Sequence, residues 1–193
     1  MSRIKSNASP EEWDIAKKLL GWMVCAKRPL RWNEIQGAVS MNAAEQTIDF
    51  DQRKLRVHIK DICGSLIQVM PGDRLQLVHS TARAYITKTD YVSQATVECS
   101  LAALCMQYLT FECFDEEIDP RKLRELALDG HFIFQDYAIS QWFLHLYTII
   151  DFGPNRSLKD LEAKRAFTAA IQDFVSRYED DILEPASMEA VKA

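Results

Sequence analysis

The hydrophobic pattern changes period between residues 67 and 78, and this change constrains the fold more than any other feature of the sequence. Residues 67–70 and 75–78 alternate in side-chain character, which is typical of half-buried strands. The segment between them, Pro71-Gly72-Asp73-Arg74, is rich in residues that favour turns. The pattern therefore predicts a β-hairpin with a four-residue loop, and we expect no other strand pair in the chain.

Two helices are predicted upstream of the hairpin by their capping residues and apolar spacing. Ser9 suits the N-cap of the first helix, Pro10 its first helical position and Glu12 the capping box, and the helical pattern continues to about residue 27. A shorter helix is expected over residues 32–39, where apolar side chains share one face. Residues 40–50 are interpreted as a connection.

A third helix is predicted to start near Asp51, because apolar residues then recur at steps of four, three and four, at Leu55, Ile59, Ile62 and Leu66. Three helices followed by a hairpin is the element order of a winged helix. Further helices are expected over residues 80–86, 94–109, 120–128, 132–147 and 158–182. The predicted fold is therefore mainly α, with a winged helix (three helices plus β-hairpin) followed by a helical bundle.

A length of 193 residues suits one large domain or two small ones. We expect a winged-helix domain over residues 9–90 and a helical domain over residues 93–183, with a soft boundary between them. Residues 1–8 are predicted to be a disordered N-terminus and residues 184–193 a flexible tail.

Charge and cysteine content are those of an ordinary intracellular protein. The chain has 23 Lys and Arg against 28 Asp and Glu, a formal net charge of -5, so it is not a bulk binder of polyanions. The five cysteines include no C-x-x-C pair and lie among apolar neighbours, which is typical of reduced core thiols. No secretory signal or apolar run of membrane-spanning length occurs, so we expect a cytoplasmic protein without a membrane partner.

The motifs of common catalytic and nucleotide-binding sites are absent from the sequence. No glycine is followed by lysine, which excludes a P-loop, and G-x-G-x-x-G, G-x-S-x-G and H-E-x-x-H do not occur. The four histidines are scattered and have no cysteine or carboxylate at metal-ligand spacing. We therefore expect no enzyme activity, metal or cofactor in this chain alone. An enzyme with an unrecognised site would need a deep pocket with converging polar groups.

A basic cluster on the predicted third helix has two interpretations. Its members are Arg53, Lys54, Arg56, His58 and Lys60. In a free-standing DNA-binding regulator, Arg53, Lys54, Arg56 and Lys60 would contact DNA from a recognition helix in the major groove. The other interpretation is the solvated face of an amphipathic helix, and the acidic net charge favours it.

His79 follows the second strand of the predicted hairpin and precedes a predicted helix, for which Ser80 suits the N-cap. A neutral histidine here is suited to donate a hydrogen bond to a phosphate oxygen, helped by the amides of the helix start. The alternative is a polar residue that bonds to the backbone at a strand-to-helix junction, and from the residues alone we favour it.

An aromatic stretch gathers on the predicted helix over residues 132–147. It consists of Phe132, Phe134, Tyr137, Trp142, Phe143 and Tyr147. Aromatic anchors dominate protein interfaces, so the stretch is a candidate docking surface. A core stripe is the more frequent origin of such spacing, and we favour that interpretation.

Several segments together resemble the winged-helix region of fungal NACHT-type STAND NTPases. Residues 20–35, LGWMVCAKRPLRWNEI, resemble the opening of that region, and residues 77–86, LVHSTARAYI, resemble its closing hairpin-to-helix segment. Weaker similarity to the helical stretch that often follows is carried by residues 104–111 and 136–138, with Trp142 and His145. The resemblance spans residues 12 to 147 without the NTPase core.

The resemblance implies a signalling switch in which the winged helix packs on a nucleotide-binding core and holds it in the ADP-bound state. It implies that His79 contacts the nucleotide, although the chain has Val78-His79-Ser80 where plant and animal relatives have Met-His-Asp. ADP or ATP would bind only with an NTPase core joined to this chain in cis or in trans. We therefore expect a non-catalytic, protein-binding regulatory segment, either part of a larger protein or a short relative, and leave its oligomeric state open.

Overall fold

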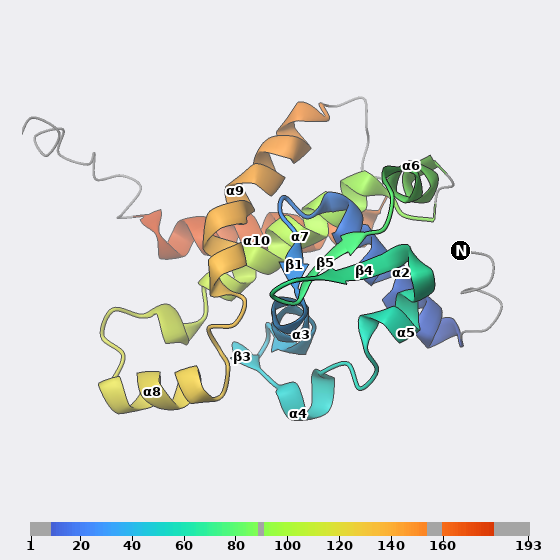
Figure 1. Ribbon diagram of the computed structural model, residues 1–193. Coiled ribbons are helices and arrows are strands. Elements are labelled where there is room, and N and C mark those ends of the chain that lie inside the picture. The colour runs from blue at the N-terminus through green and yellow to red at the C-terminus, as the bar shows by residue number, and fades with distance from the viewer. Residues whose placement is uncertain (1–8, 89–90, 154–159, 180–193) are drawn as a thin grey trace, which may run out of the picture.

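The computed structural model describes residues 9–88, 91–153 and 160–179, and it is mainly helical with two small sheets (Figure 1). Its helices are α2 (Pro10–Cys25), α3 (Trp32–Ser40), α4 (Phe50–Arg53), α5 (Ile59–Cys63), α6 (Ser80–Lys88), α7 (Gln94–Leu109), α8 (Pro120–Leu128), α9 (Gln135–Asp151) and α10 (Leu161–Arg177). The strands are β1 (Leu30–Arg31), β2 (Met41–Asn42), β3 (Thr47–Ile48), β4 (Ile67–Met70) and β5 (Arg74–Leu77). The predicted N-terminal segment and tail, residues 1–8 and 184–193, lie outside the described residues.

The first helix begins where its capping residues predict. The Ser9 hydroxyl accepts a hydrogen bond from the Glu12 amide at 3.2 Å, and the Glu12 carboxylate accepts one from the Ser9 amide at 2.8 Å. This reciprocal pair satisfies amides that would otherwise have no partner at the helix start. The second half of α2 is buried on all sides, from Leu19 to Cys25, so it forms the centre of the winged-helix part.

The predicted hairpin is confirmed, with a loop one residue shorter than expected. Arg74 pairs with Met70, so only residues 71–73 connect β4 and β5. Gly72 and Asp73 both have positive φ, 76° and 55°, a backbone conformation that glycine and aspartate tolerate better than most residues.

The expectation of a single strand pair is wrong, because the structure has three further strands of two residues each that the sequence pattern did not indicate. β1 pairs antiparallel with β5, placing Leu30 opposite Leu75, and completes a three-stranded sheet in the order β1-β5-β4. β2 and β3 form a second pair, with Met41 opposite Ile48, inside the segment interpreted as a connection. Strands of two residues are too short to show a period-two alternation.

The single helix predicted from Asp51 to Leu66 is also wrong. The chain forms α4, leaves the helical conformation after Arg53 and re-enters it at α5, where the His58 ring nitrogen Nδ1 accepts a hydrogen bond from the Lys60 amide at 3.2 Å. The Gln36 side chain explains the break, because it bonds both the amide and the carbonyl of Leu55, at 2.9 and 3.1 Å. These backbone groups are therefore bound by a distant side chain instead of by the next helical turn.

The helical part is built around α7, which contacts α9 on one side and α10 on another (Figure 1). The predicted bounds of α7 and α8 are confirmed, whereas α9 and α10 each begin three residues late. Leu161, at the first position of α10, is exposed.

One hydrophobic core runs from α2 through α7 to α9 and joins the two predicted domains. Gly21 of α2 lies so close to α7 that a Cβ atom there would stand 2.8 Å from Cγ2 of Val97. All five cysteines are free and buried, as their apolar neighbours predict. No helix among the described residues is long and apolar enough to cross a membrane.

Candidate functional site

His79 lies exposed at the junction of β5 and α6, between two hollows in the surface. Its carbonyl accepts a hydrogen bond from the Ala82 amide at 3.0 Å in the first turn of α6. Its ring makes no hydrogen bond to any residue that the structure describes. The alternative of a side chain bonded to the local backbone is therefore wrong, and the imidazole is available to a group from outside the chain.

The hollow on one side of His79 has a volume of about 360 Å³ and a basic rim. It is formed by the loop between α2 and β1, by β5 and by the first turn of α6. Its charged and polar members are Lys27, Arg28, Gln76, His79, Ser80 and Arg83. These are donor side chains around a helix N-terminus, the combination that favours an anionic group.

A second hollow, of about 540 Å³, adjoins the other side of His79 and is mainly apolar. Its lining residues are Ser65, Leu66, Val78, His79, Thr81, Ala82 and Tyr85. His79 thus separates a basic hollow from an apolar one.

Three cationic side chains line the basic hollow, and two of them, Lys27 and Arg28, form ion pairs with carboxylates of the chain. The Arg28 guanidinium makes two hydrogen bonds to the Glu34 carboxylate, at 2.7 and 2.9 Å, and a third to Asp136 at 2.6 Å. These pairs raise the pKa of Arg28, and the largest contribution comes from the hydrogen bond to Glu34. Arg83 has no ion pair among the described residues, so Arg83 and His79 are the donors left for a partner.

Behind the basic hollow, Lys27 belongs to a largely buried polar network that connects the loop after α2 to α7 and α9. The Lys27 ammonium donates to Oε1 of Glu98 and to Oγ1 of Thr148, both at 2.8 Å. The other oxygen of Glu98 lies 2.6 Å from Nδ1 of His145. Glu98 is 1% exposed and His145 0%, so these charges and dipoles interact with little screening by water.

The network is completed by Tyr137, whose hydroxyl lies 2.8 Å from Nε2 of His145 and 3.4 Å from the Lys27 amide. Burial lowers the pKa of His145, and the hydrogen bond to Glu98 opposes this shift. Burial also raises the pKa of the Tyr137 phenol. A neutral His145 that donates from Nδ1 to Glu98 and accepts at Nε2 from Tyr137 satisfies each group.

Sequence reasoning missed this network because its members are far apart in the chain. Glu98 lies 71 residues from Lys27 and 47 from His145. The only local signal is the charge of Glu98 in a helix whose other buried members are apolar or tyrosine. A carboxylate in such a setting requires a partner, although its position in the sequence does not identify which one.

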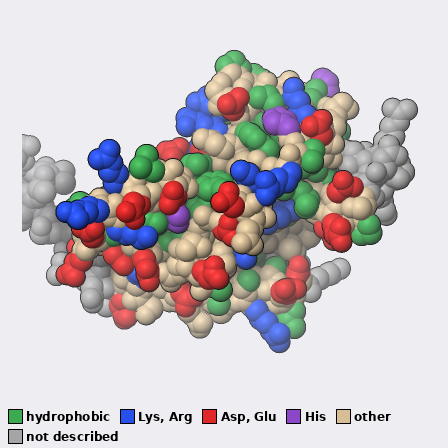
Figure 2. Space-filling view, turned by 90° about the horizontal axis from the view of Figure 1, so that it is seen from below, with side chains coloured by type: hydrophobic (Ala, Val, Ile, Leu, Met, Phe, Trp, Pro, Cys, Tyr) green, Lys and Arg blue, Asp and Glu red, His purple; other side chains and the backbone are tan. Residues whose placement is uncertain are grey.

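The basic cluster proposed for DNA contact is not assembled on one helix. Arg53 ends α4 and donates to the Met41 carbonyl at 2.8 Å, and Arg56 in the following segment donates to the Asp51 carbonyl at 2.5 Å. Lys54 caps α4, whereas Lys60 lies on the five-residue helix α5. Figure 2 shows acidic and basic side chains interleaved over this side of the molecule. The recognition helix that the DNA-binding alternative needs therefore does not form.

The aromatic stretch divides between core and surface. Phe134 and Tyr137 are buried and stack at 5.4 Å between ring centroids, and Trp142 packs on Phe174 of α10 at 4.9 Å. Phe143 and Tyr147 are exposed. The core interpretation is confirmed for the buried members, and the two exposed ones remain candidates for an interface.

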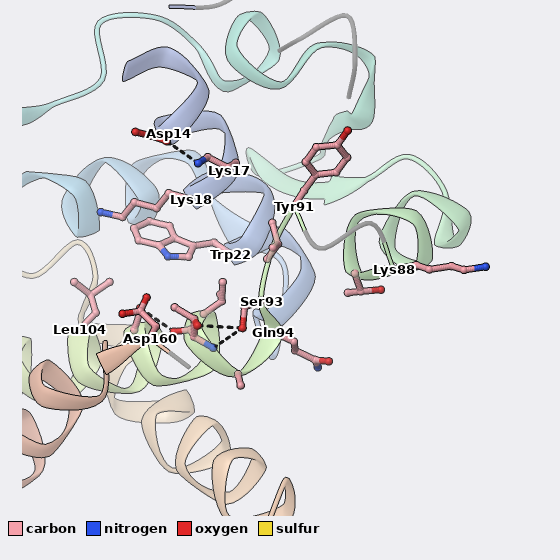
Figure 3. A pocket seen from close by; sticks show the side chains of 16 residues that line it. Asp14, Lys17, Lys18, Trp22, Lys88, Tyr91, Ser93, Gln94, Leu104 and Asp160 are labelled. Carbon is pink, nitrogen blue, oxygen red and sulfur yellow. Dashed lines mark hydrogen bonds and ion pairs between the residues drawn. The ribbon is translucent and has the colours of Figure 1, made fainter. Parts of the chain in front are cut away.

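A third hollow lies between α2 and the start of α7, with a volume of about 1410 Å³ (Figure 3). Its polar groups are largely engaged in local structure. Lys17 pairs with Asp14 at 2.7 Å, Ser93 caps α7, and Asp160 caps α10. No group of three or more His, Cys, Asp or Glu that could hold a metal ion occurs within the described ranges.

Comparison with known proteins identifies the first half of this architecture. Residues 6–98 match the family model described as GPI inositol-deacylase, winged helix domain. No curated protein and no solved structure matches the chain. The match covers the segment from α2 through α6 and the start of α7, and α8, α9 and α10 lie outside it. Residues 6–98 are therefore similar to the winged helix domain of GPI inositol-deacylase, and the chain combines a winged helix with a helical region that the match does not cover.

Proposed function

We propose that the chain is a non-catalytic regulatory segment that packs against a nucleotide-binding NTPase core, in cis or in trans, and stabilises its ADP-bound closed state. The resemblance to the winged-helix region of NACHT-type STAND proteins motivates the proposal. The observation that supports it most is the exposed His79 ring, which has no partner among the described residues and lies beside a basic hollow.

The chemistry of this surface suits a nucleotide held by another domain. A neutral imidazole and the Arg83 guanidinium both donate hydrogen bonds, and a diphosphate accepts several. The amides at the start of α6 add a favourable dipole. The apolar hollow beside Tyr85 and Leu66 offers the surface on which a neighbouring core would pack.

The test is an intact NACHT-type STAND protein whose own winged-helix and helical regions are replaced by this chain. Bound ADP is measured over time after dilution into excess ATP, with wild-type and His79→Ala grafts. We expect the variant to release ADP about tenfold faster, because a hydrogen bond to a charged phosphate is lost. Its basal signalling activity should rise accordingly.

The matched control is Arg56→Ala, which removes a positive side chain on another segment of the winged helix. We expect it to leave ADP release unchanged. Equal release rates from the wild-type and His79→Ala grafts would show that His79 does not stabilise the closed state.

A further inference from the structure

The outer face of α9 is apolar although no described part of the chain covers it. Ile139, Phe143, Tyr147 and Ile150 recur at steps of four, four and three, and they are 54%, 53%, 66% and 68% exposed. This stripe extends about 17 Å along the helix at 1.5 Å per residue. Figure 1 shows the C-terminal half of α9 extending beyond the rest of the helical part.

A comparison with α10 shows that an apolar exposed face is not common to all long outer helices of this chain. Both helices have 17 residues and both pack on α7. The exposed positions of α10 include Glu162, Lys164, Arg165 and Asp173, the usual mixture of charges on a solvated face. The corresponding face of α9 contains no Lys or Arg, because none occurs between Gln135 and Asp151.

The inner face of α9 fixes the stripe in place. Tyr137, Ala138 and His145 are fully buried, and the Lys27 ammonium bonds Thr148 in the last turns of the helix. A partner therefore meets a helix that is already ordered, and binding costs little conformational entropy on this side. Aromatic anchors on a rigid helix are the usual centres of binding energy in an interface.

The charges at the two ends of the stripe indicate the partner. Asp136 precedes it and Asp151 follows it, and both are acidic. Asp136 pairs with Arg28, but Arg28 also pairs with Glu34, so that group keeps one net negative charge. Asp151 lies at the C-terminal end of the helix, where the backbone dipole is itself negative.

We infer that the α9 stripe docks an amphipathic helix with an apolar face and basic residues at both ends. A second copy of this chain fits poorly. An antiparallel α9 pair centred on the stripe would place Asp136 opposite the other copy's Asp151, and a parallel pair would place each aspartate opposite itself. Like charges would face each other in both arrangements, whereas a basic helix is complementary at both ends. The four apolar side chains of the stripe line neither hollow beside His79.

The test uses the full chain and a designed helical peptide with leucines at helical spacing and lysines at both ends. A second peptide has the same leucines with glutamates at its ends. Binding is measured by fluorescence anisotropy at two salt concentrations. We expect the lysine peptide to bind about tenfold more tightly or better, with an advantage that shrinks as salt increases.

Two variants locate the site on the protein. Phe143→Ser with Tyr147→Ser should weaken the lysine peptide by about tenfold or more. Leu161→Ser with Val175→Ser removes two exposed apolar side chains from α10 and should leave binding unchanged. Because all four residues are exposed, circular dichroism should show that both variants remain folded.

Three results would overturn the inference. Equal affinity for the two peptides would mean that charge does not select the partner. Unchanged binding by the α9 variant would place the peptide elsewhere. A dimer of the wild-type chain that Phe143→Ser with Tyr147→Ser dissociates, seen by light scattering, would show that a second copy occupies the stripe.

Discussion

Two polar clusters meet at the loop between α2 and β1, and they differ in what surrounds them. The buried cluster joins Lys27 to Glu98, His145 and Tyr137, and each of these side chains has partners inside the chain. The exposed cluster at His79 and Arg83 borders the basic hollow and has no side-chain partners among the described residues. Lys27 itself lines the hollow, so the two clusters adjoin.

This difference in burial suggests that the buried cluster contributes to stability and the exposed cluster to recognition of a partner. Buried polar groups must be paired, because an unpaired one costs its full desolvation free energy. An exposed donor loses nothing by remaining hydrated, so it is free to bond a partner. We therefore expect changes in the buried cluster to alter the free energy of unfolding and changes in the exposed cluster to leave it nearly constant.

The largest effect is expected for Glu98→Ala, which leaves the partly buried Lys27 without its carboxylate and the buried His145 without its acceptor. We expect a loss of about 3–5 kcal/mol in the free energy of unfolding, the range for breaking one side of a buried pair. Urea denaturation followed by circular dichroism measures it. Glu116→Ala, at an exposed position, is the matched control and should change stability by less than about 0.5 kcal/mol. Equal stability of the two variants would contradict a structural role for the network.

Tyr137→Phe removes only the hydroxyl and keeps the ring that stacks on Phe134. The Nε2 atom of His145 then has no donor, and we expect a loss of about 1–2 kcal/mol. The same urea measurement applies. A loss within error of zero would mean that the hydroxyl contributes nothing to the stability of the network. Glu98 would then be the only member of the buried cluster with a tested effect on the free energy of unfolding.

Stability should also depend on pH in the range where histidine titrates. Burial lowers the pKa of His145 in the folded state, so as pH falls through about 6.5 the unfolded chain gains a proton that the folded chain does not. The free energy of unfolding should therefore decrease on acidification, by at most about 1.4 kcal/mol per pH unit for this residue. His131, whose pKa is also lowered by burial, adds to the slope.

The contribution of His145 is isolated by comparing the slope of stability against pH in wild type and His145→Gln, between about pH 7.5 and pH 5.5. The variant should have the smaller slope whatever its stability at neutral pH. Identical slopes would mean that the pKa of His145 is the same in the folded and unfolded states, so that Glu98 balances burial and the nearby Lys27 ammonium. A larger slope in the variant would mean that His145 is protonated in the folded state.

The smallest effect is expected for His79→Ala. The ring has no described partner, so the free energy of unfolding should change by less than about 0.5 kcal/mol. This measurement also shows that the variant proposed for the nucleotide-release test is folded. A loss above about 1 kcal/mol would place His79 with the buried cluster and would remove the contrast between the two.

Elements with local signals were predicted well. The start of α2 depends on Ser9 and Glu12, three residues apart, and α8 begins with Pro120 at the position that proline prefers. The hairpin depends on alternation within twelve residues and on Gly72 and Asp73 in the turn. The position of His79 at the junction of a strand and a helix followed from the same local patterns.

Elements that depend on distant partners were not predicted. The apolar spacing through Leu55 indicates a continuous helix, but Gln36 captures the backbone of that residue from 19 positions away. The prediction that the basic residues share one helical face depended on the prediction that this helix is continuous. Its separation into α4, α5 and the segment between them removed the DNA-contacting surface.

The sequence by itself determined where most helices and the hairpin form, because capping, turn conformation and hydrophobic period act over a few residues. Only the tertiary structure decided which polar groups are buried, which remain exposed and where the third helix breaks. Those outcomes depend on contacts such as Lys27 with Glu98, and on the free energy of removing charged groups from water. The buried network and the exposed His79 are therefore distinguished by the packing of α2, α7 and α9 and not by any motif.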